Sequence, residues 1–315
     1  MKYLVTGGAG FIGFNLVNQL LDEGHEVTVV DCMNDYYDPE LKENRIKNYR
    51  KEVKVHRVDI ADRADLEKVI KENKFDAIAH LAAQAGVRYS LENPGAYVQA
   101  NYVGTFNVLD LAKEFGIKKV VLASTSSVYG TSKNMPFKET ELAPEPMSIY
   151  AATKRGTEYL GATYSHLYDM DVICLRFFTV YGPWGRPDMA LFLFTDKILK
   201  GEEIDVYNNG DMKRDFTYVG DIVSGFSLAL EKGKGYEIFN IGNGSPVQLM
   251  AFIKTIETEL GIEAKINFMP IQPGDVPETS ADISKAKELL GYEPKVSVGE
   301  GIKNFIDWYK EYYQK

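Results

Sequence analysis

The chain has 315 residues, of which 45% are hydrophobic and 26% charged, and its formal net charge is −9. The acidic balance argues against a surface for DNA or for anionic membranes, because neither would be attracted by the average field of the protein. The two cysteines, Cys32 and Cys174, provide neither a disulfide framework nor the spacing of a metal site. We therefore expect a soluble globular protein with no bound metal and no nucleic-acid or membrane partner.

Residues 1–6 already have the composition of a strand. They do not form the basic segment, apolar stretch and cleavage site of a secretory leader. No apolar run in the chain approaches the length needed to span a bilayer. A reducing cytoplasm is the expected location.

The first half of the chain alternates short apolar runs with amphipathic stretches. Buried strands joined by helical crossovers predict a parallel sheet covered by helices on both faces. The expected strands are Tyr3–Val5, Glu26–Asp31, Val53–Val58, Asp76–His80, Lys119–Ala123 and Val172–Arg176, and the expected helices are Phe11–Glu23, Arg63–Glu72 and Ala100–Phe115.

Proline and glycine become more frequent after residue 176 and divide the chain into short elements. This change predicts a first domain over residues 1–176, with parts of 215–240, and a smaller α/β domain made mainly of 177–315. The C-terminal stretch Gly301–Tyr313 has the apolar spacing of a packed amphipathic helix.

A glycine-rich sequence follows the first strand and opens the first helix. Gly7 permits a tight turn, Gly10 lets the backbone approach a pyrophosphate, and Gly13 allows close packing of helix and strand. Phe11 and Ile12 belong to the same motif and begin the helix, whose N-terminus offers free N–H groups and partial positive charge. The motif predicts a dinucleotide site.

Acidic residues at strand ends indicate which dinucleotide binds. Asp31 ends the second strand about 20 residues after the glycines, where a carboxylate accepts hydrogen bonds from the adenine ribose. The same carboxylate would repel a 2′-phosphate, so NAD is expected rather than NADP. Asp59 and Ile60 end the third strand and are expected to border the adenine.

Tyr150 and Lys154 are spaced by four residues, which places them on one face of a helix. A phenol with a pKa of about 10 is a poor base at neutral pH. The positive charges of Lys154 and of a nicotinamide ring would lower that pKa, so Tyr150 could take a proton from a substrate hydroxyl during its oxidation. Thr125, at the end of the fifth strand, would hydrogen-bond the same oxygen.

Together these residues resemble the extended short-chain dehydrogenases/reductases. The resemblance covers essentially the whole chain and includes Asn101, which is mostly structural in that family. It implies a doubly wound parallel (Rossmann) α/β fold, retained NAD, and a homodimer formed by helices near 100–115 and 148–169. It also adds three residues to the expected cofactor site, Leu81, Ala82 and Ala83.

The branches of this family differ in the residues after the catalytic threonine. Dehydratases have Asp-Glu there, whereas this chain has Ser126 and Ser127, so dehydration is not expected. The stretches Asp35–Pro39 and Arg176–Ala190 resemble UDP-glucuronate 4-epimerases. That resemblance implies that Arg214 contacts the UDP diphosphate and that Asp275 lies near the uridine ribose.

The carboxylate of a uronic acid requires hydrogen-bond donors or a cation in its pocket. The residues expected around it are Ser126, Ser127, Thr179, Arg186 and, after the fourth strand, Arg88. The expected reaction interconverts UDP-glucuronate and UDP-galacturonate at C4 through a 4-keto sugar. The residues leave open a UDP-glucose 4-epimerase, a UDP-glucuronate decarboxylase and a catalytically silent NAD-binding regulator.

Overall fold

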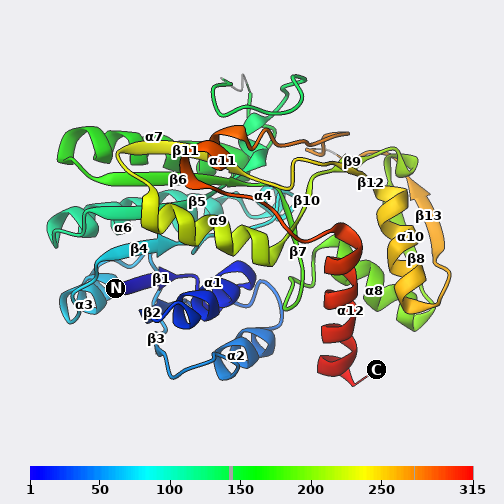
Figure 1. Ribbon diagram of the computed structural model, residues 1–315, viewed down its shortest axis with the longest axis horizontal. Coiled ribbons are helices and arrows are strands. Elements are labelled where there is room, and N and C mark those ends of the chain that lie inside the picture. Colours follow the sequence, from blue (N-terminus) through cyan, green and yellow to red (C-terminus); the bar gives the residue numbers. More distant parts are fainter. Residues whose placement is uncertain (142–144, 273, 315) are drawn as a thin grey trace.

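A seven-stranded parallel sheet forms the centre of the computed structural model, which describes residues 1–141, 145–272 and 274–314 (Figure 1). The strand order is β11-β6-β5-β4-β1-β2-β3. From β1 to β3 the chain builds toward one edge of the sheet, and from β4 onward it builds toward the other edge, so the order switches between β1 and β4. The doubly wound fold is therefore confirmed. The strands are β1 (Lys2–Thr6), β2 (Glu26–Val30), β3 (Lys54–His56), β4 (Ala77–His80), β5 (Lys119–Thr125), β6 (Asp171–Phe177) and β11 (Tyr236–Ile241).

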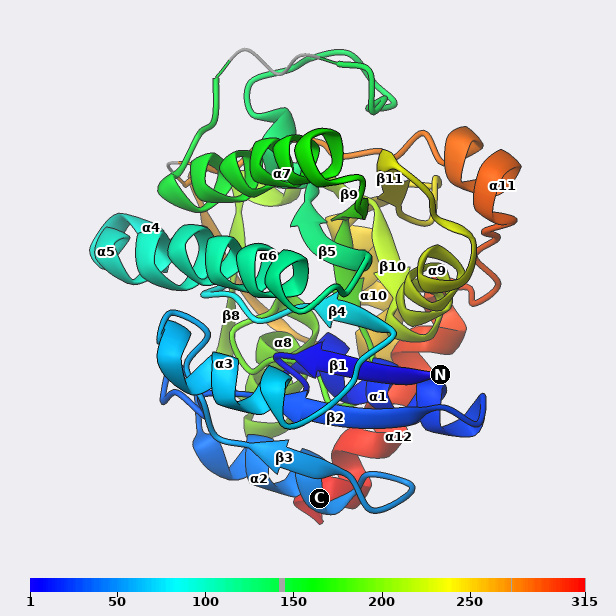
Figure 2. The same ribbon diagram turned by 90° about the vertical axis from the view of Figure 1, so that its left-hand side faces the viewer.

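Helices cover both faces of this sheet (Figure 2). One face packs against α1 (Phe11–Asp22), α9 (Val219–Lys232) and α11 (Ser284–Leu290). The other packs against α3 (Arg63–Lys71), α6 (Gly104–Glu114) and α7 (Ile149–Tyr168). Because both faces are covered, the central strands are buried at nearly every position, as in the β-branched run of β2.

The predicted strands agree with the observed ones to within two residues at each end. The helix predicted over 100–115 is made of two segments, a π-helical segment η1 (Val98–Val103) and the α-helix α6 that follows it. Two short helices, α4 (Tyr89–Glu92) and α5 (Pro94–Tyr97), precede η1. Asn101 lies in η1 and is fully buried. Its side-chain amide donates to the carbonyl of Gln84 at 3.1 Å and to the hydroxyl of Thr153 at 3.1 Å, which connects the chain after β4 to α7.

The second half of the chain builds a smaller unit beyond the carboxyl ends of the sheet strands (Figure 1). It has a separate aromatic core, in which the rings of Phe216 and Phe252 stack with centroids 3.9 Å apart. The predicted C-terminal helix is confirmed as α12, which starts three residues earlier. The unit contains α8 (Ala190–Lys200), α10 (Leu249–Leu260), α12 (Val298–Tyr313), and the strand pairs β7 (Thr179–Tyr181) with β10 (Phe216–Tyr218), β8 (Glu203–Tyr207) with β13 (Lys265–Met269), and β9 (Lys213–Arg214) with β12 (Val247–Gln248).

The described ranges contain neither a membrane-spanning helix nor a cluster of metal ligands. None of the helices found there is both long and apolar enough to cross a membrane. No group of three His, Cys, Asp or Glu side chains within those ranges is arranged as metal ligands would be.

A buried ion pair fixes α7 to the sheet. Glu158 on α7 and Arg176 on β6 have side-chain exposures of 1% and 0%. The Nε and Nη2 of Arg176 donate to the two carboxylate oxygens of Glu158, each at 2.8 Å. Ser124, at the end of β5, donates its hydroxyl to the same carboxylate at 2.7 Å. One carboxylate therefore connects α7 to two neighbouring strands.

The variant Arg176→Met should lower the free energy of unfolding by about 3–5 kcal/mol, because it leaves the Glu158 carboxylate buried without its main partner. The double variant Glu158→Leu/Arg176→Met should be markedly more stable than the single variant, since it removes both charges. Urea unfolding followed by circular dichroism would measure the three midpoints. Equal destabilisation in the single and double variants would contradict this account of the pair.

Candidate active site

The turn between β1 and α1 is shaped for close approach of a phosphate group. Gly7 has φ +72°, and a Cβ on it would lie 2.6 Å from the nitrogen of Ala82. A Cβ on Gly13 would lie 2.1 Å from the carbonyl oxygen of Gly7, so both positions require glycine. Gly10 is the N-cap of α1 and has no side chain to occupy the first N–H groups of the helix. These groups suit the pyrophosphate of a dinucleotide.

Phe11 and Ile12 contribute to this turn mainly by packing. The Phe11 side chain is 5% exposed, and Ile12 packs against the core on the α1 face of the sheet. A ligand at the start of α1 would therefore meet their backbone N–H groups rather than their side chains.

Asp31 follows β2 and is fixed beside the glycine turn. Its carboxylate accepts hydrogen bonds from the backbone nitrogens of Ala9, at 3.1 Å, and Met33, at 2.9 Å. The side chain is 6% exposed, and the ammonium of Lys42 lies 3.9 Å away. Such a carboxylate at the end of the second strand fits the ribose diol of NAD.

The remaining predicted cofactor residues follow β3 and β4 at the same edge of the sheet. The nitrogens of Leu81 and Ala82 donate to the carbonyl and hydroxyl of the threonine that ends β1, at 3.0 and 3.2 Å, and Ala83 follows them. Asp59 accepts a hydrogen bond from the backbone two residues later, and Ile60 is buried. The structure thus brings the predicted cofactor residues together along the carboxyl ends of β1 to β4.

The predicted reactive residues lie where β5 ends and α7 begins. Ser148 caps α7 by accepting a hydrogen bond from the nitrogen of Ala151 at 3.1 Å, which places Tyr150 in the first turn. Lys154 follows one turn later, 5% exposed, and donates to the carbonyl of Ala123 on β5 at 3.0 Å. Thr125 is the last residue of β5.

The environment acts on the titration of both residues. Burial raises the pKa of the Tyr150 phenol, while a hydrogen bond with Thr125 and the charge of Arg186 lower it. Burial lowers the pKa of Lys154 to about 8, opposed by Cys174 and Glu158. The lysine is therefore still mostly protonated at neutral pH and able to stabilise a nearby phenolate.

Ser126 and Ser127 open a short 3₁₀ turn, η2 (Ser126–Tyr129), directly after β5. The Thr125 hydroxyl accepts from the nitrogen of Ser127 at 3.1 Å and donates to its hydroxyl at 3.2 Å. Thr125 therefore caps the turn, and neither serine is needed for that purpose. Both serines are partly exposed, so their hydroxyls remain available to a ligand.

Arg186 lies in the loop between β7 and α8, on the substrate side of the reactive residues. Its positive charge lowers the pKa of Tyr150, although burial outweighs this effect, so the guanidinium lies near enough to the phenol to interact with it electrostatically. Its Nε and Nη2 donate to the carboxylate of Asp188, which also accepts from the hydroxyl of Tyr36 at 3.1 Å. Thr179 begins β7, and its backbone donates to the chain before β10.

A second group of charges is separate from Arg186. The Nη2 of Arg88 lies 3.7 Å from Asp275, and its guanidinium lies 4.8 Å from the ring centroid of Tyr207. Burial lowers the pKa of Arg214, an effect that the charge of Asp275 opposes. Arg88 is expected among the residues around the sugar carboxylate, and in this structure its guanidinium contacts Asp275 and Tyr207.

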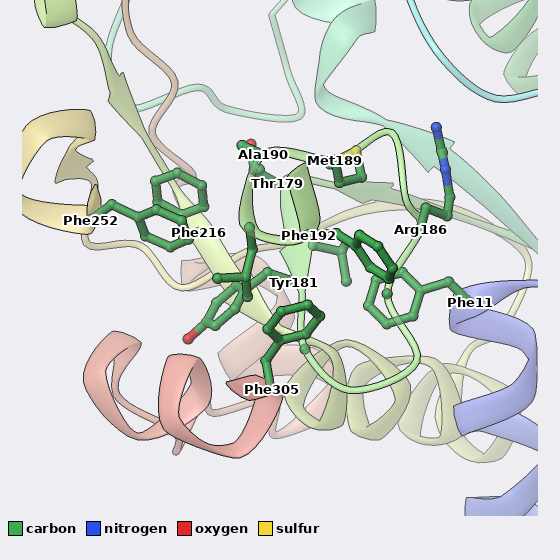
Figure 3. Close-up of a pocket in the computed structure, with 14 residues that line it drawn as sticks. Phe11, Thr179, Tyr181, Arg186, Met189, Ala190, Phe192, Phe216, Phe252 and Phe305 are labelled. Atoms are coloured by element: carbon green, nitrogen blue, oxygen red, sulfur yellow. The ribbon is translucent and has the colours of Figure 1, made fainter. Parts of the chain in front are cut away.

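A pocket beneath the Arg186 loop is lined mainly by apolar residues, several of them aromatic (Figure 3). Phe11, Tyr181, Phe192 and Phe305 surround it, while the Arg186 side chain points away from these rings (Figure 3). Neither Tyr150 nor any residue of β5 lines it. This space therefore belongs to the packing between α1, α8 and α12 and not to the reactive group.

Arg45, on α2 (Pro39–Lys47), has a role that sequence reasoning missed. The side chain is fully buried, and its Nη1 donates to the carbonyl of Ala9 in the glycine turn at 3.0 Å. Its Nη2 donates to the carbonyl of Trp184, in the loop that carries Arg186, at 2.6 Å. One guanidinium thus joins the predicted cofactor turn to the predicted sugar loop. Only the resemblance of residues 35–39 to UDP-glucuronate 4-epimerases pointed to this region.

Comparisons with known proteins agree with this arrangement. Residues 4–305 match the family model described as GDP-mannose 4,6 dehydratase. A UDP-glucuronate 4-epimerase from Thermodesulfobacterium geofontis is 46% identical, over 98% of this chain and 96% of its own length. UDP-glucuronate 4-epimerase 4 from Arabidopsis thaliana is 44% identical, over 98% of this chain and 75% of its own length.

Solved structures show the same fold over the full chain. UDP-glucuronic acid 4-epimerase from Bacillus cereus, in complex with UDP-glucuronic acid and NAD, has a TM-score of 0.93 and 36% identity, covering 99% of this chain and 100% of that one. UDP-glucose 4-epimerase from Thermotoga maritima, with UDP-glucose, has a TM-score of 0.92 and 33% identity, with the same coverage. The chain therefore belongs to the NAD-dependent epimerase/dehydratase family of extended short-chain dehydrogenases/reductases.

Proposed function

We propose that this protein is an NAD-dependent 4-epimerase that interconverts UDP-glucuronate and UDP-galacturonate. The observation that carries the proposal is Arg186, whose charge acts on the pKa of Tyr150 in α7, in a chain whose β1–α1 turn is shaped for NAD. A cation in that place suits a sugar that carries a carboxylate. The relatives and structures that act on or bind UDP-glucuronate support the same substrate.

Tyr150 is the proton carrier in this proposal. Its phenolate accepts the proton of the C4 hydroxyl as C4 is oxidised, and the phenol returns the proton to the ketone oxygen when C4 is reduced. NAD, when bound, supplies the oxidation and the reduction at C4. Thr125 hydrogen-bonds the reacting oxygen, and the charge of Lys154 stabilises the phenolate. Since the proton and both electrons are returned, the net change is the configuration at C4.

Four residues hold the sugar carboxylate: Ser126, Ser127, Thr179 and Arg186. The 4-keto sugar has its ketone β to this carboxylate and is prone to lose carbon dioxide. Donors that keep the negative charge on the carboxylate oppose that loss, because decarboxylation moves the charge onto the ketone. This chemistry favours epimerisation over the decarboxylase alternative.

The two units of the chain divide the ligands between them. Residues 1–176, with parts of 215–240, bind NAD through the glycine turn, Asp31 and the strand ends, while 177–315 mainly bind the UDP-sugar. Arg214 and Asp275 hold the UDP portion, and the ion pair of Arg88 with Asp275 supports a place for Arg88 at the same end. The cytoplasm is the proposed location, in keeping with the free thiols of Cys32 and Cys174.

Two copies of the chain associate through α6 and α7 in this proposal. The large side chains exposed along η1, α6 and α7 include Tyr102 by 41%, Phe106 by 42% and Tyr159 by 59%. Association through these helices would remove this apolar surface from water, and the family resemblance supports the same face.

The variant Phe106→Glu/Tyr159→Glu should halve the molar mass measured by light scattering, because it places four carboxylates in a twofold interface. The thermal midpoint of the Rossmann core should change little. Retention of the wild-type mass would contradict this dimer face. The matched control is Leu193→Glu, at an exposed position of α8, which should leave the mass unchanged.

Incubation of the purified protein with UDP-glucuronate should produce UDP-galacturonate without release of carbon dioxide, as followed by NMR. A UDP-pentose product would instead identify a decarboxylase. Turnover of UDP-glucose alone, run in parallel, would identify a hexose epimerase.

The variant Tyr150→Phe is the control for catalysis. Turnover should fall by about 10²–10⁴-fold, the usual contribution of a general base, while NAD binding is retained. Loss of NAD along with activity would show only that the site had collapsed. Unchanged turnover would remove Tyr150 from the mechanism.

The buried charge of Lys154 should destabilise the protein in the absence of cofactor. At pH 7, Lys154→Met should unfold at a higher urea concentration than the wild type. Its free energy of unfolding should be larger by about 1–3 kcal/mol. The wild-type penalty is complete below pH 8, because the lysine is then charged in both the folded and the unfolded state. Above pH 8 the folded lysine loses its proton first, so the advantage of the variant should shrink up to about pH 10.5. A pH-independent difference would contradict the assignment.

A further inference from the structure

The guanidinium fork of Arg186, formed by the N–H groups of Nε and Nη2, is occupied by Asp188 of the same loop. The nitrogen of Met189 donates to the carbonyl of Arg186 at 3.1 Å, which closes a tight turn over residues 186–189. Within this turn the Arg186 guanidinium and the Asp188 carboxylate lie side by side, with Nε donating to Oδ1 at 2.9 Å and Nη2 to Oδ2. This is the two-point geometry in which arginine binds carboxylates most strongly.

A residue from the cofactor side of the molecule holds this pair in place. Tyr36 follows β2, and its hydroxyl donates to Oδ2 of Asp188 at 3.1 Å. Its ring centroid lies 5.8 Å from the Arg186 guanidinium. A Cβ on Gly86 would lie 2.5 Å from the Tyr36 hydroxyl, so the glycine makes room for it. Asp188 is therefore fixed from two directions.

The pairing reduces the charge that Arg186 presents to the substrate. Burial would raise the pKa of the Asp188 carboxyl, but Arg186 and Tyr36 bring it below its usual value, so the residue is ionised at neutral pH. Of the five N–H donors of Arg186, Asp188 engages two. Three donors remain, and Tyr36 also interacts with the guanidinium through its ring and its hydroxyl. The substrate carboxylate would meet these outer donors and not the free fork.

We propose that Asp188 is a positioning residue that determines turnover and specificity: by occupying the Arg186 fork, it keeps that arginine from clamping the sugar carboxylate through two bonds. The inference rests on the proposed function, because it requires a substrate with a carboxylate on the sugar. During epimerisation the keto sugar must leave one orientation and present its other face. A free two-point clamp would stabilise the first orientation, and this added ground-state binding would slow the reorientation.

The substitution Asp188→Asn tests the proposal, since it removes the charge but leaves an amide oxygen for Tyr36. The KM for UDP-glucuronate should fall about three- to tenfold, and kcat should fall by a similar factor, because a stronger ground state raises the barrier to turnover. The Kd of UDP alone, measured by calorimetry, should not change. Tyr36→Phe should shift KM and kcat in the same direction by less, and it provides a second variant should Asp188→Asn fail to fold.

Unchanged KM and kcat in both variants, or a raised KM for UDP-glucuronate, would overturn the proposal. A change in the Kd of UDP would also overturn it, because that result indicates general damage to the site. Wild-type protein that does not turn over UDP-glucuronate at all would instead refute the proposed function. Normal wild-type turnover with unaltered Asp188→Asn kinetics would refute the role of Asp188 alone.

Discussion

The buried ion pair between Glu158 and Arg176 determines where the catalytic helix lies. Glu158 is one turn beyond Lys154 on α7, and its carboxylate is shared by β6 and, through Ser124, by β5. Ser124 is the neighbour of Thr125, so the same contact sets the end of β5 against the start of α7. Because a buried carboxylate must keep its partners, α7 has little freedom to slide along the sheet. The relative position of the phenol, the ammonium and the threonine hydroxyl follows from this constraint.

Sequence reasoning located features that depend on short spacings. The glycine turn, Asp31 and the Tyr150–Lys154 pair each follow from a motif next to a strand or on one helix turn, and parallel strands bring their carboxyl ends together. It did not find the ion pair of Glu158 with Arg176, because the apolar periodicity of a helix does not reveal a buried charge whose partner lies on a distant strand. The π-helical start of the helix expected at 100–115 was missed for a related reason. Its side-chain pattern resembles that of an α-helix, and the hydrogen bonds of Asn101 are long-range.

Two arginines of the expected sugar-nucleotide site already have acidic partners. Arg186 is paired with Asp188, and Arg88 with Asp275, at two separate places. Such pairs offer a weaker field to passing anions than free cations would, so selection depends on the shape and number of hydrogen bonds as well as on charge. This arrangement suits a substrate that carries a diphosphate at one end and a carboxylate at the other.

Arg45 gives the proposed cofactor turn and the proposed sugar loop a common support. Its guanidinium bonds the carbonyl of Ala9 in the cofactor turn and that of Trp184 in the sugar loop. A rigid planar group that satisfies both carbonyls restricts both loops at once, so ordering one loop reduces the entropy that remains to be lost in the other. Thermodynamic linkage then makes the effect reciprocal: whatever the dinucleotide contributes to sugar affinity, the sugar nucleotide contributes equally to retention of the dinucleotide. An epimerase that must keep its reduced cofactor until the second half of the reaction benefits from such mutual retention.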